Sequence, residues 1–349
     1  MTKRTLLVLF ITLFAANVSA EPYELPTNKD GSPVTGVLTA GFDPLDSSGN
    51  GPVYPFPFNL FFLDLETFDI TDFTLNLPVD DPNDFRDPAV VLSAMDGFST
   101  TEKWTVNFLD GYFNGSSTAR PPGRIDPASV IPGQSVRLFQ VTTSNLLFVT
   151  GIVRELTPGV DYVAAAADGG ILAIIPLKPL QEMTSYMAVL TNDIKDTRGN
   201  NATPDTTYFL SQSDTSWVDE NGNSTYPLIS DELAPTLEVV RQVTNSMETA
   251  AESAGVVRED IIMSWTVQTQ SITPVLKYLR SIAKPAPTVV GPANLNTSAV
   301  GGRGIADIYS GIITLPYYLG VPGADNQVAP LTDFWTAAPG AYIPPFDQR

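Results

Sequence analysis

The chain of 349 residues contains no cysteine and no histidine. Without cysteine, no disulfide can brace the fold, and no N-terminal cysteine is available to carry a lipid anchor. Without histidine, a Ser-His-Asp triad or Cys-His dyad lacks its general base. Because cysteine and histidine are both absent, zinc loses its two commonest ligands. Gly-x-Ser-x-Gly, Walker and dinucleotide-binding motifs do not occur in the sequence either. The sequence therefore lacks the standard devices for histidine-dependent hydrolysis, zinc chemistry and nucleotide binding.

Basic side chains are scarce, because the chain has 19 Lys and Arg against 38 Asp and Glu. Such an acidic excess is typical of a soluble protein in a saline or extracellular setting, and cation binding is the alternative. We expect no nucleic acid and no anionic membrane surface as a direct partner, because no basic patch offsets the repulsion. Hydrophobic residues make up 43% of the sequence, which provides a core for one large domain or two ordinary ones.

Residues 1–20 have the pattern of a signal peptide. Lys3 and Arg4 form the charged region, an apolar stretch follows, and Val18-Ser19-Ala20 supplies small side chains for cleavage. The apolar stretch is shorter than the roughly 20 residues that a membrane span needs. We expect a mature chain that starts at Glu21, has no transmembrane helix, and carries 17 basic and 38 acidic side chains, a net charge of −21. The expected location is secreted, periplasmic or at the cell surface, without a lipid anchor.

Short apolar runs separated by Gly and Pro turns predict a mostly β fold. Residues 21–55 lack periodicity and are expected to be extended, and residues 56–284 are expected to form an immunoglobulin-like β-sandwich. In the run after Pro132-Gly133, Val136, Leu138 and Gln140 are expected to share one face of a strand, opposite Arg137 and Phe139. The Pro- and Gly-rich residues 285–349 are expected to form a linker and an apolar tail.

Residues 171–200 predict two strands and a bend between them. The strands are expected at 171–175 and 186–190, with Pro176 and Pro179 in the bend, as in the hairpin and corner of an immunoglobulin-like sandwich. In such sandwiches a tyrosine hydroxyl at this position often holds the preceding connection, so Tyr186 is expected to do so. An ordinary buried tyrosine is the alternative.

A helix is predicted within the sandwich over residues 235–254. Pro235 suits a first helical turn, Gly255 suits a helix end, and apolar positions recur every three or four residues between them. These positions are Leu237, Val240, Thr244, Met247, Ala251 and Ala254. A period of two returns after this helix and places Trp265 on the core face of a strand. A short second helix is predicted to start at Thr273-Pro274.

The candidate metal ligands lie in "DENGNSTYP". Asp219, Asn221 and Asn223 have the spacing of an EF-hand loop, but glycine falls one residue early at Gly222, and the twelfth position is Ser230 instead of glutamate. We therefore expect a solvated turn, with weak Ca²⁺ binding as the alternative. No other cofactor is indicated.

Ser281 and Lys284 match Ser-x-x-Lys, a spacing that would place both side chains on one helix face. No Ser-Asp-Asn or Lys-Thr-Gly partner occurs, so a lysine that interacts with the end of a helix is expected there.

Six segments together resemble the N-terminal region of the bacterial virulence factor lipase family, which contains secreted and surface lipases and lysophospholipases. They follow the order of the family over most of the chain. The segments are "PFPFNLFF" (55–62), "DGFST" (96–100), "RIDPASVIPGQSVRLFQV" (124–141), "ILAIIPLKPLQEMTSYMAVLTNDIKDTRGN" (171–200), "IIMSWTVQTQS" (261–271) and "ADIYSGIITLPYYL" (306–319).

The resemblance implies a lipid ester hydrolase in two parts: a β-sandwich followed by an α/β-hydrolase domain with serine, acid and histidine. The present chain is expected to stop where that second domain begins, so no catalytic residue carries over to it. It would then be a non-catalytic module that supports or docks a hydrolase domain, in the same chain or a separate one. A stand-alone secreted binding or adhesion module, with or without a requirement for calcium, is one alternative. A complete hydrolase with unfamiliar residues is another.

The candidate docking surface lies in the tail. "DIYSGIITLPYYLGVP" combines isoleucines and leucines with Tyr309, Tyr317, Tyr318 and Leu319 after the predicted linker. An apolar segment of this kind in water typically marks an interface. It either folds back as one more sandwich strand or docks the hydrolase domain.

Overall fold

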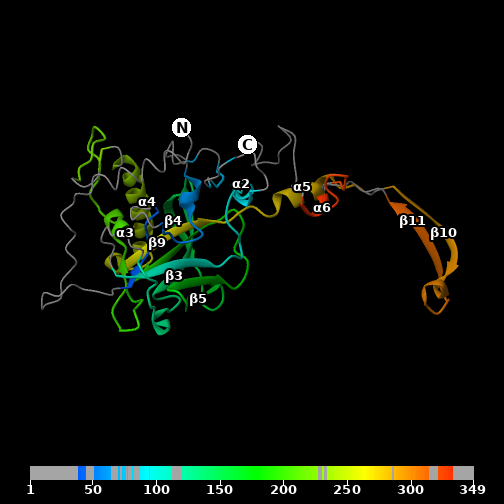
Figure 1. The fold of residues 1–349 in the computed structure, drawn as a ribbon, viewed down its shortest axis with the longest axis horizontal. Coiled ribbons are helices and arrows are strands. Elements are labelled where there is room, and N and C mark those ends of the chain that lie inside the picture. The colour runs from blue at the N-terminus through cyan, green and yellow to red at the C-terminus, as the bar shows by residue number, and fades with distance from the viewer. Residues whose placement is uncertain are drawn as a thin grey trace. The chain divides into compact units, whose positions relative to one another are not determined.

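A computed structural model gives the fold of the chain, which divides into two compact units, residues 1–271 and 272–349 (Figure 1). The structure describes residues 38–44, 51–63, 70, 73–75, 77, 81, 87–93, 95–111, 120–226, 230–231, 234–284, 287–313 and 321–332. We call the first unit the main unit and the second the C-terminal unit. Each is described by itself.

The described part of the main unit contains a five-stranded sheet and a four-stranded sheet. The order in the first sheet is β5-β6-β2-β1-β8, antiparallel except for the parallel β1–β8 pair. Its strands are β1 (Leu38–Ala40), β2 (Trp104–Asp110), β5 (Tyr162–Ala167), β6 (Ile171–Pro176) and β8 (Thr203–Pro204). The order in the second sheet is β4-β3-β7-β9, with all pairs antiparallel. Its strands are β3 (Val136–Ser144), β4 (Phe148–Glu155), β7 (Ser185–Thr191) and β9 (Ile261–Gln268).

The two sheets share one apolar core. The ring of Trp104 in β2 lies 6.2 Å from the ring of Trp265 in β9, measured between ring centroids. Trp265 is fully buried, as the alternation of its strand predicts. Tyr162 of β5 also joins the sheets, because its hydroxyl donates to the carbonyl of Val136 in β3 at 2.9 Å. The fold is thus mostly β, as predicted, and its immunoglobulin-like character stays a prediction.

Helix α4 (Ala234–Ser253) confirms the predicted helix within one residue at each end. Gly255 follows with a φ of 79°, a left-handed conformation that glycine adopts without steric cost. The predicted apolar positions are buried, except for Ala254, which is half-buried. In Figure 1, α4 lies beside β4 and β9 of the four-stranded sheet.

Coverage by α4 helps to explain why two strands of the four-stranded sheet are buried on both faces. Every residue of β7 and β9 is buried. Arg137 of β3 donates to the carbonyl of Ala254 just beyond α4, at 3.0 Å, so its face of the sheet points toward the helix. Phe139 shares that face and is fully buried, although alternation alone predicts a more exposed position. The strands β7 and β9 are therefore inner strands, whereas β4 at the edge of the sheet is largely exposed.

The bend before β7 is a crossing between the sheets. The strand β6 pairs with β2 and β5, whereas β7 pairs with β3 and β9. The predicted hairpin of β6 and β7 is therefore wrong. The predicted corner between them is present. The hydroxyl of Tyr186 accepts a hydrogen bond from the backbone N–H of Gln181 at 3.0 Å. The tyrosine therefore holds the preceding connection, as predicted.

Short helical segments complete the main unit. They are η1 (Asn59–Phe62), α2 (Pro88–Leu92), η2 (Pro127–Ser129), α3 (Thr206–Ser211) and η3 (Arg258–Asp260). The run around η1 forms irregular cover, where the rings of Phe56, Phe61, Phe62 and Phe98 meet edge to face. Residues 21–55 are expected to be extended. The part of this segment that the structure describes includes β1, which is buried and pairs with β2 and β8.

The C-terminal unit contains a helix and a two-stranded sheet where the sequence suggests a helix and a linker. Helix α5 (Pro274–Ile282) is followed by β10 (Thr288–Asn296), η4 (Thr297–Val300), β11 (Asp307–Ile313) and α6 (Ala329–Thr332). The strands β10 and β11 pair as an antiparallel hairpin. Among the described residues of the whole chain, no helix is long and apolar enough to cross a membrane.

Candidate functional site

The predicted calcium ligands form a turn in which the carboxylate is bound by its own loop. Oδ1 of Asp219 accepts from the backbone N–H groups of Asn221 and Asn223, both at 2.8 Å. Oδ2 accepts from the side-chain amide of Asn223 at 3.3 Å. The hydrogen bond from the backbone of Asn223 is the main reason that the pKa of Asp219 lies below its usual value. The φ of 82° at Gly222 explains why glycine occurs there. Calcium binding at this turn stays a prediction.

The described residues contain no group of three or more Asp and Glu side chains that could hold a metal ion. They contain a groove of about 410 Å³ between β4 and α4, lined by Val149, Thr150, Gly151, Asn245, Ser246, Thr249, Ala250 and Ser253. Its lining has hydroxyl and amide groups but no charged side chain. The other polar feature of α4 is a network of charged and amide side chains that joins it to the loop after α3.

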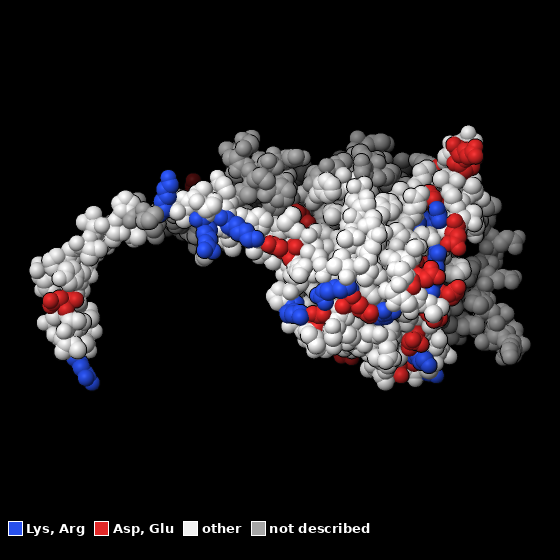
Figure 2. Space-filling model, turned by 180° about the vertical axis from the view of Figure 1, so that it is seen from behind, with Lys and Arg blue, Asp and Glu red and all other residues white. Residues whose placement is uncertain are grey.

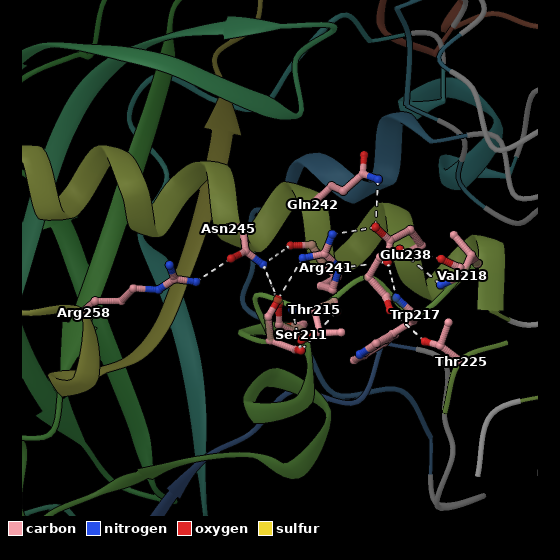
Figure 3. Close-up of polar contacts among 12 residues, drawn as sticks. Ser211, Thr215, Trp217, Val218, Thr225, Glu238, Arg241, Gln242, Asn245 and Arg258 are labelled. Carbon is pink, nitrogen blue, oxygen red and sulfur yellow. Dashed lines mark hydrogen bonds and ion pairs between the residues drawn. The ribbon is translucent and has the colours of Figure 1, made fainter. Parts of the chain in front are cut away.

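Glu238 anchors the loop after α3 to the first turns of α4 (Figure 3). Its Oε2 accepts from the backbone N–H of Trp217 at 2.9 Å and from Nε of Arg241 at 2.8 Å. Its Oε1 accepts from the guanidinium of Arg241 at 2.6 Å and from the amide of Gln242 at 2.9 Å. Burial by itself would raise the pKa of Glu238, but these hydrogen bonds outweigh it and lower the pKa to about 2. The carboxylate is therefore charged, fully paired and structural.

Asn245 continues the network about two turns beyond Glu238 along α4 (Figure 3). Its amide nitrogen donates to the carbonyl of Ser211 at 3.2 Å and to that of Ser213 at 3.1 Å. Its amide oxygen accepts from the guanidinium of Arg258, which also donates to the carbonyl of Gln212 at 3.1 Å. Backbone carbonyls at the end of α3 thus find donors on α4 and η3, which satisfies the unpaired groups at a helix end.

Glu248 is the most deeply buried acid of the network and has no exposed surface. Its Oε1 accepts from the hydroxyl of Tyr208 at 3.0 Å and from the amide of Gln212 at 2.7 Å, and its Oε2 accepts from Arg258 at 3.1 Å. The hydroxyl of Tyr208 also meets that of Ser264 in β9 at 2.7 Å. Burial raises the pKa of Glu248. Both oxygens are occupied by protein donors, so the group ties α3 and α4 to the sheet.

Sequence reasoning missed both buried glutamates, although a signal for each is present. Glu238 precedes Arg241 by three residues and Gln242 by four, the spacing at which helix side chains meet. Glu248 follows Thr244 by four residues and so lies on the apolar stripe of α4. An acid on such a stripe requires a buried donor. For Glu248 the donors are Tyr208 of α3, Gln212 at the end of α3 and Arg258 of η3, which the sequence alone did not place beside the helix.

The remaining candidate surface is the β10–β11 hairpin of the C-terminal unit. Val289 pairs with Ile312, and their side chains are each 76% exposed. Val290, Tyr309 and Ile313 lie on the other face by strand alternation and are also exposed. Both faces therefore present apolar side chains to water. An isolated two-stranded hairpin is only marginally stable, so this geometry is typical of an element that binds a partner.

The predicted docking residues fall only partly on this hairpin. Tyr309 lies in β11 opposite Pro292 of β10 and is exposed. Tyr317, Tyr318 and Leu319 lie outside the described residues. The sequence did not single out the residues of β10. Gly291 and Pro292 follow Val289 and Val290 directly, so the segment resembles a linker and not a strand.

The sequence of the chain matches one known protein family. The family model of the bacterial virulence factor lipase N-terminal region matches residues 76–300. The chain belongs to this family. Searches of curated proteins and of solved structures found no match.

The match to the lipase N-terminal family confirms the resemblance that the ordered segments indicate. The matched region covers the four-stranded sheet, α4 and its network, and then α5 and β10. It ends at Val300, in the connection between the two strands of the hairpin. The lipase N-terminal region of this chain thus reaches into the C-terminal unit, and includes one strand of the exposed hairpin.

Proposed function

We propose that this chain is the non-catalytic N-terminal module of a secreted lipase or lysophospholipase, and that its hairpin docks an α/β-hydrolase domain that acts on lipid esters. The observation that carries the proposal is the hairpin with apolar side chains on both faces, in a member of a lipase N-terminal family. The hydrolase domain is bound in the same chain or as a separate one. The main unit is the supporting body, with an immunoglobulin-like arrangement of its sheets.

Export is part of the proposal. The charged region, apolar stretch and small residues of segment 1–20 support a cleaved signal peptide. An intact mass that begins at Glu21, measured on protein recovered from outside the cytoplasm, is the expected result. An intact mass that retains Met1 would contradict it.

The docking test replaces one pair of facing apolar side chains. Val289→Thr with Ile312→Thr keeps β-branched side chains in the strands and removes apolar surface from the proposed interface. The control is Val160→Thr with Val257→Thr, two exposed valines of the main unit. Full burial of a valine or isoleucine is worth about 1.5–3 kcal/mol, so we expect the hairpin variant to bind a purified hydrolase domain of this family at least about ten-fold more weakly. The control variant should bind like the unaltered chain.

Equal binding by both variants would remove the hairpin from the interface. Failure of the unaltered chain to bind any hydrolase domain of the family would favour the alternative of a stand-alone binding or adhesion module. Deletion of residues 304–349 provides a second measurement, because it removes β11. A much lower melting temperature of the remaining chain would mean that the segment belongs to the core.

A further inference from the structure

Charge is segregated along the chain in a way that its overall composition conceals. No Asp or Glu occurs between Asp260 and Asp307, although the chain has 38 of them. The basic side chains in this stretch are Lys277, Arg280, Lys284 and Arg303. Figure 2 shows basic side chains gathered on the helix of the C-terminal unit, whereas acidic and basic side chains are mixed on the main unit. The expectation that the chain has no basic patch is therefore wrong for this segment.

Helix α5 separates these charges from an apolar face. Lys277 and Arg280 are three residues apart and lie on one side of the helix. Leu279 and Ile282 lie on the other side, Leu276 lies between Leu279 and Arg280, and Tyr278 is next to Ile282. The side chains of Leu276, Tyr278 and Ile282 are 60%, 48% and 44% exposed.

The end of the helix has a lysine just beyond it, as the sequence predicts, and not a Ser-x-x-Lys pair on one helix face. Because α5 ends at Ile282, Ser281 and Lys284 do not share a helix face, and the hydroxyl of Ser281 donates to the carbonyl of Tyr278 at 2.7 Å. Lys284 lies exposed just beyond the helix C-terminus. It adds a positive charge beside the negative end of the helix dipole, in line with Arg280 in the last turn.

We propose that α5 binds an anionic lipid surface. A short helix with a basic face, an apolar face and a tyrosine at its border has the composition of helices that lie in the plane of the membrane interface. Nine residues rise only about 13 Å, so the helix is far too short to span a bilayer and would lie flat. The remainder of the chain is strongly acidic, so an anionic surface attracts this segment and repels the main unit. The two charges therefore favour binding with α5 against the lipid surface. This binding requires no hydrolase domain.

The test measures partition of the purified chain, starting at Glu21, onto vesicles. One set consists of phosphatidylcholine alone and the other contains about a quarter phosphatidylglycerol. Each basic side chain near an anionic surface contributes about a five-fold change in partition, so Arg280→Gln with Lys284→Gln should weaken binding to the anionic set about 25-fold. The matched control, Lys103→Gln with Lys195→Gln, removes the same charge from exposed positions of the main unit. It should leave the partition unchanged.

A second variant tests the apolar face without removing charge. Leu276→Gln with Ile282→Gln keeps good helix formers in α5 and should also reduce the partition at least ten-fold. Binding should disappear at about 1 M salt, where the screening length falls to about 3 Å. Circular dichroism spectra that match the unaltered chain establish that each variant is folded.

Four results would overturn the proposal. They are no partition of the unaltered chain onto the anionic vesicles, equal partition onto both sets, an equal effect of the control pair, and no effect of either α5 variant. Self-association in sedimentation velocity that the α5 variants abolish, without vesicle binding, would assign the helix to a second copy of this chain instead.

Discussion

The pH dependence of stability should reveal the charged anchor between α4 and the loop after α3. Glu238 is 7% exposed at its side chain and has a pKa of about 2, against 4.5 for an ordinary glutamate. A shift of this size corresponds to about 3 kcal/mol of stabilisation of the charged form in the folded state. Because the folded pKa lies below the unfolded one, this contribution is complete above about pH 4.5. It is lost as the pH falls toward 2.

The variant Glu238→Gln removes the titrating group and keeps the shape of the side chain. Urea unfolding followed by circular dichroism should show a variant that is about 3 kcal/mol less stable near pH 7, within the range for breaking a buried ion pair. The difference between the two proteins should shrink below pH 4.5 and approach zero near pH 2. The test compares the free energies of unfolding of the two proteins at each pH. Other buried carboxylates, such as Asp161 with its lowered pKa, titrate in both proteins, so their contribution cancels in the difference.

The control is Glu252→Gln, an exposed glutamate on the same helix. This variant should unfold like the unaltered chain at every pH, within about 0.5 kcal/mol, as is usual for surface substitutions. The reasoning fails if the Glu238→Gln difference stays constant between pH 6 and pH 3. It also fails if the control variant shows the same pH dependence.

Further measurements test the core, the corner, the turn and the absence of catalysis. Trp265→Ala should cost about 3–5 kcal/mol in urea unfolding because the side chain is fully buried between the sheets, and a cost below about 1 kcal/mol would place it elsewhere. Tyr186→Phe should cost about 1 kcal/mol through loss of the hydrogen bond to Gln181, and no change would show that ring packing alone holds the corner. If the predicted turn binds calcium, the ion should raise the melting temperature, and Asp219→Ala should abolish the rise; no rise in the unaltered chain would contradict calcium binding. The purified chain should not hydrolyse a short-chain nitrophenyl ester, and turnover that one point substitution abolishes would disprove this.

Local patterns in the sequence determined several elements correctly. The period of α4, with Pro235 at its start and Gly255 after its end, depends on backbone geometry that neighbouring residues set by themselves. The same holds for the alternation that places Trp265 in the core. The hydroxyl of Tyr186 reaches a residue only five positions earlier, so its role was also within the range of a local motif. Spaced segments then sufficed to indicate the lipase family.

The β10–β11 hairpin shows where local patterns stop being informative. The register shifts between Pro292 and Leu295, so the period of two breaks within the strand, and its Pro and Gly residues resemble a linker. Pairing with β11 overrides that composition, because the hydrogen bonds come from a segment more than ten residues away. The local sequence does not contain this partner.

Tertiary structure alone decided which faces are covered and which charges are buried. Periodicity tells on which side of a strand or helix a residue lies, but not what packs against that side. Phe139 is buried because α4 covers the second face of its sheet, and β6 and β7 separate because each finds its partners in a different sheet. Glu238 and Glu248 remain on the buried side of α4 because Arg241 and Arg258 supply donors within 3.1 Å. A buried carboxylate is stable only beside such donors, and for Glu248 the fold brings the donor from a different element.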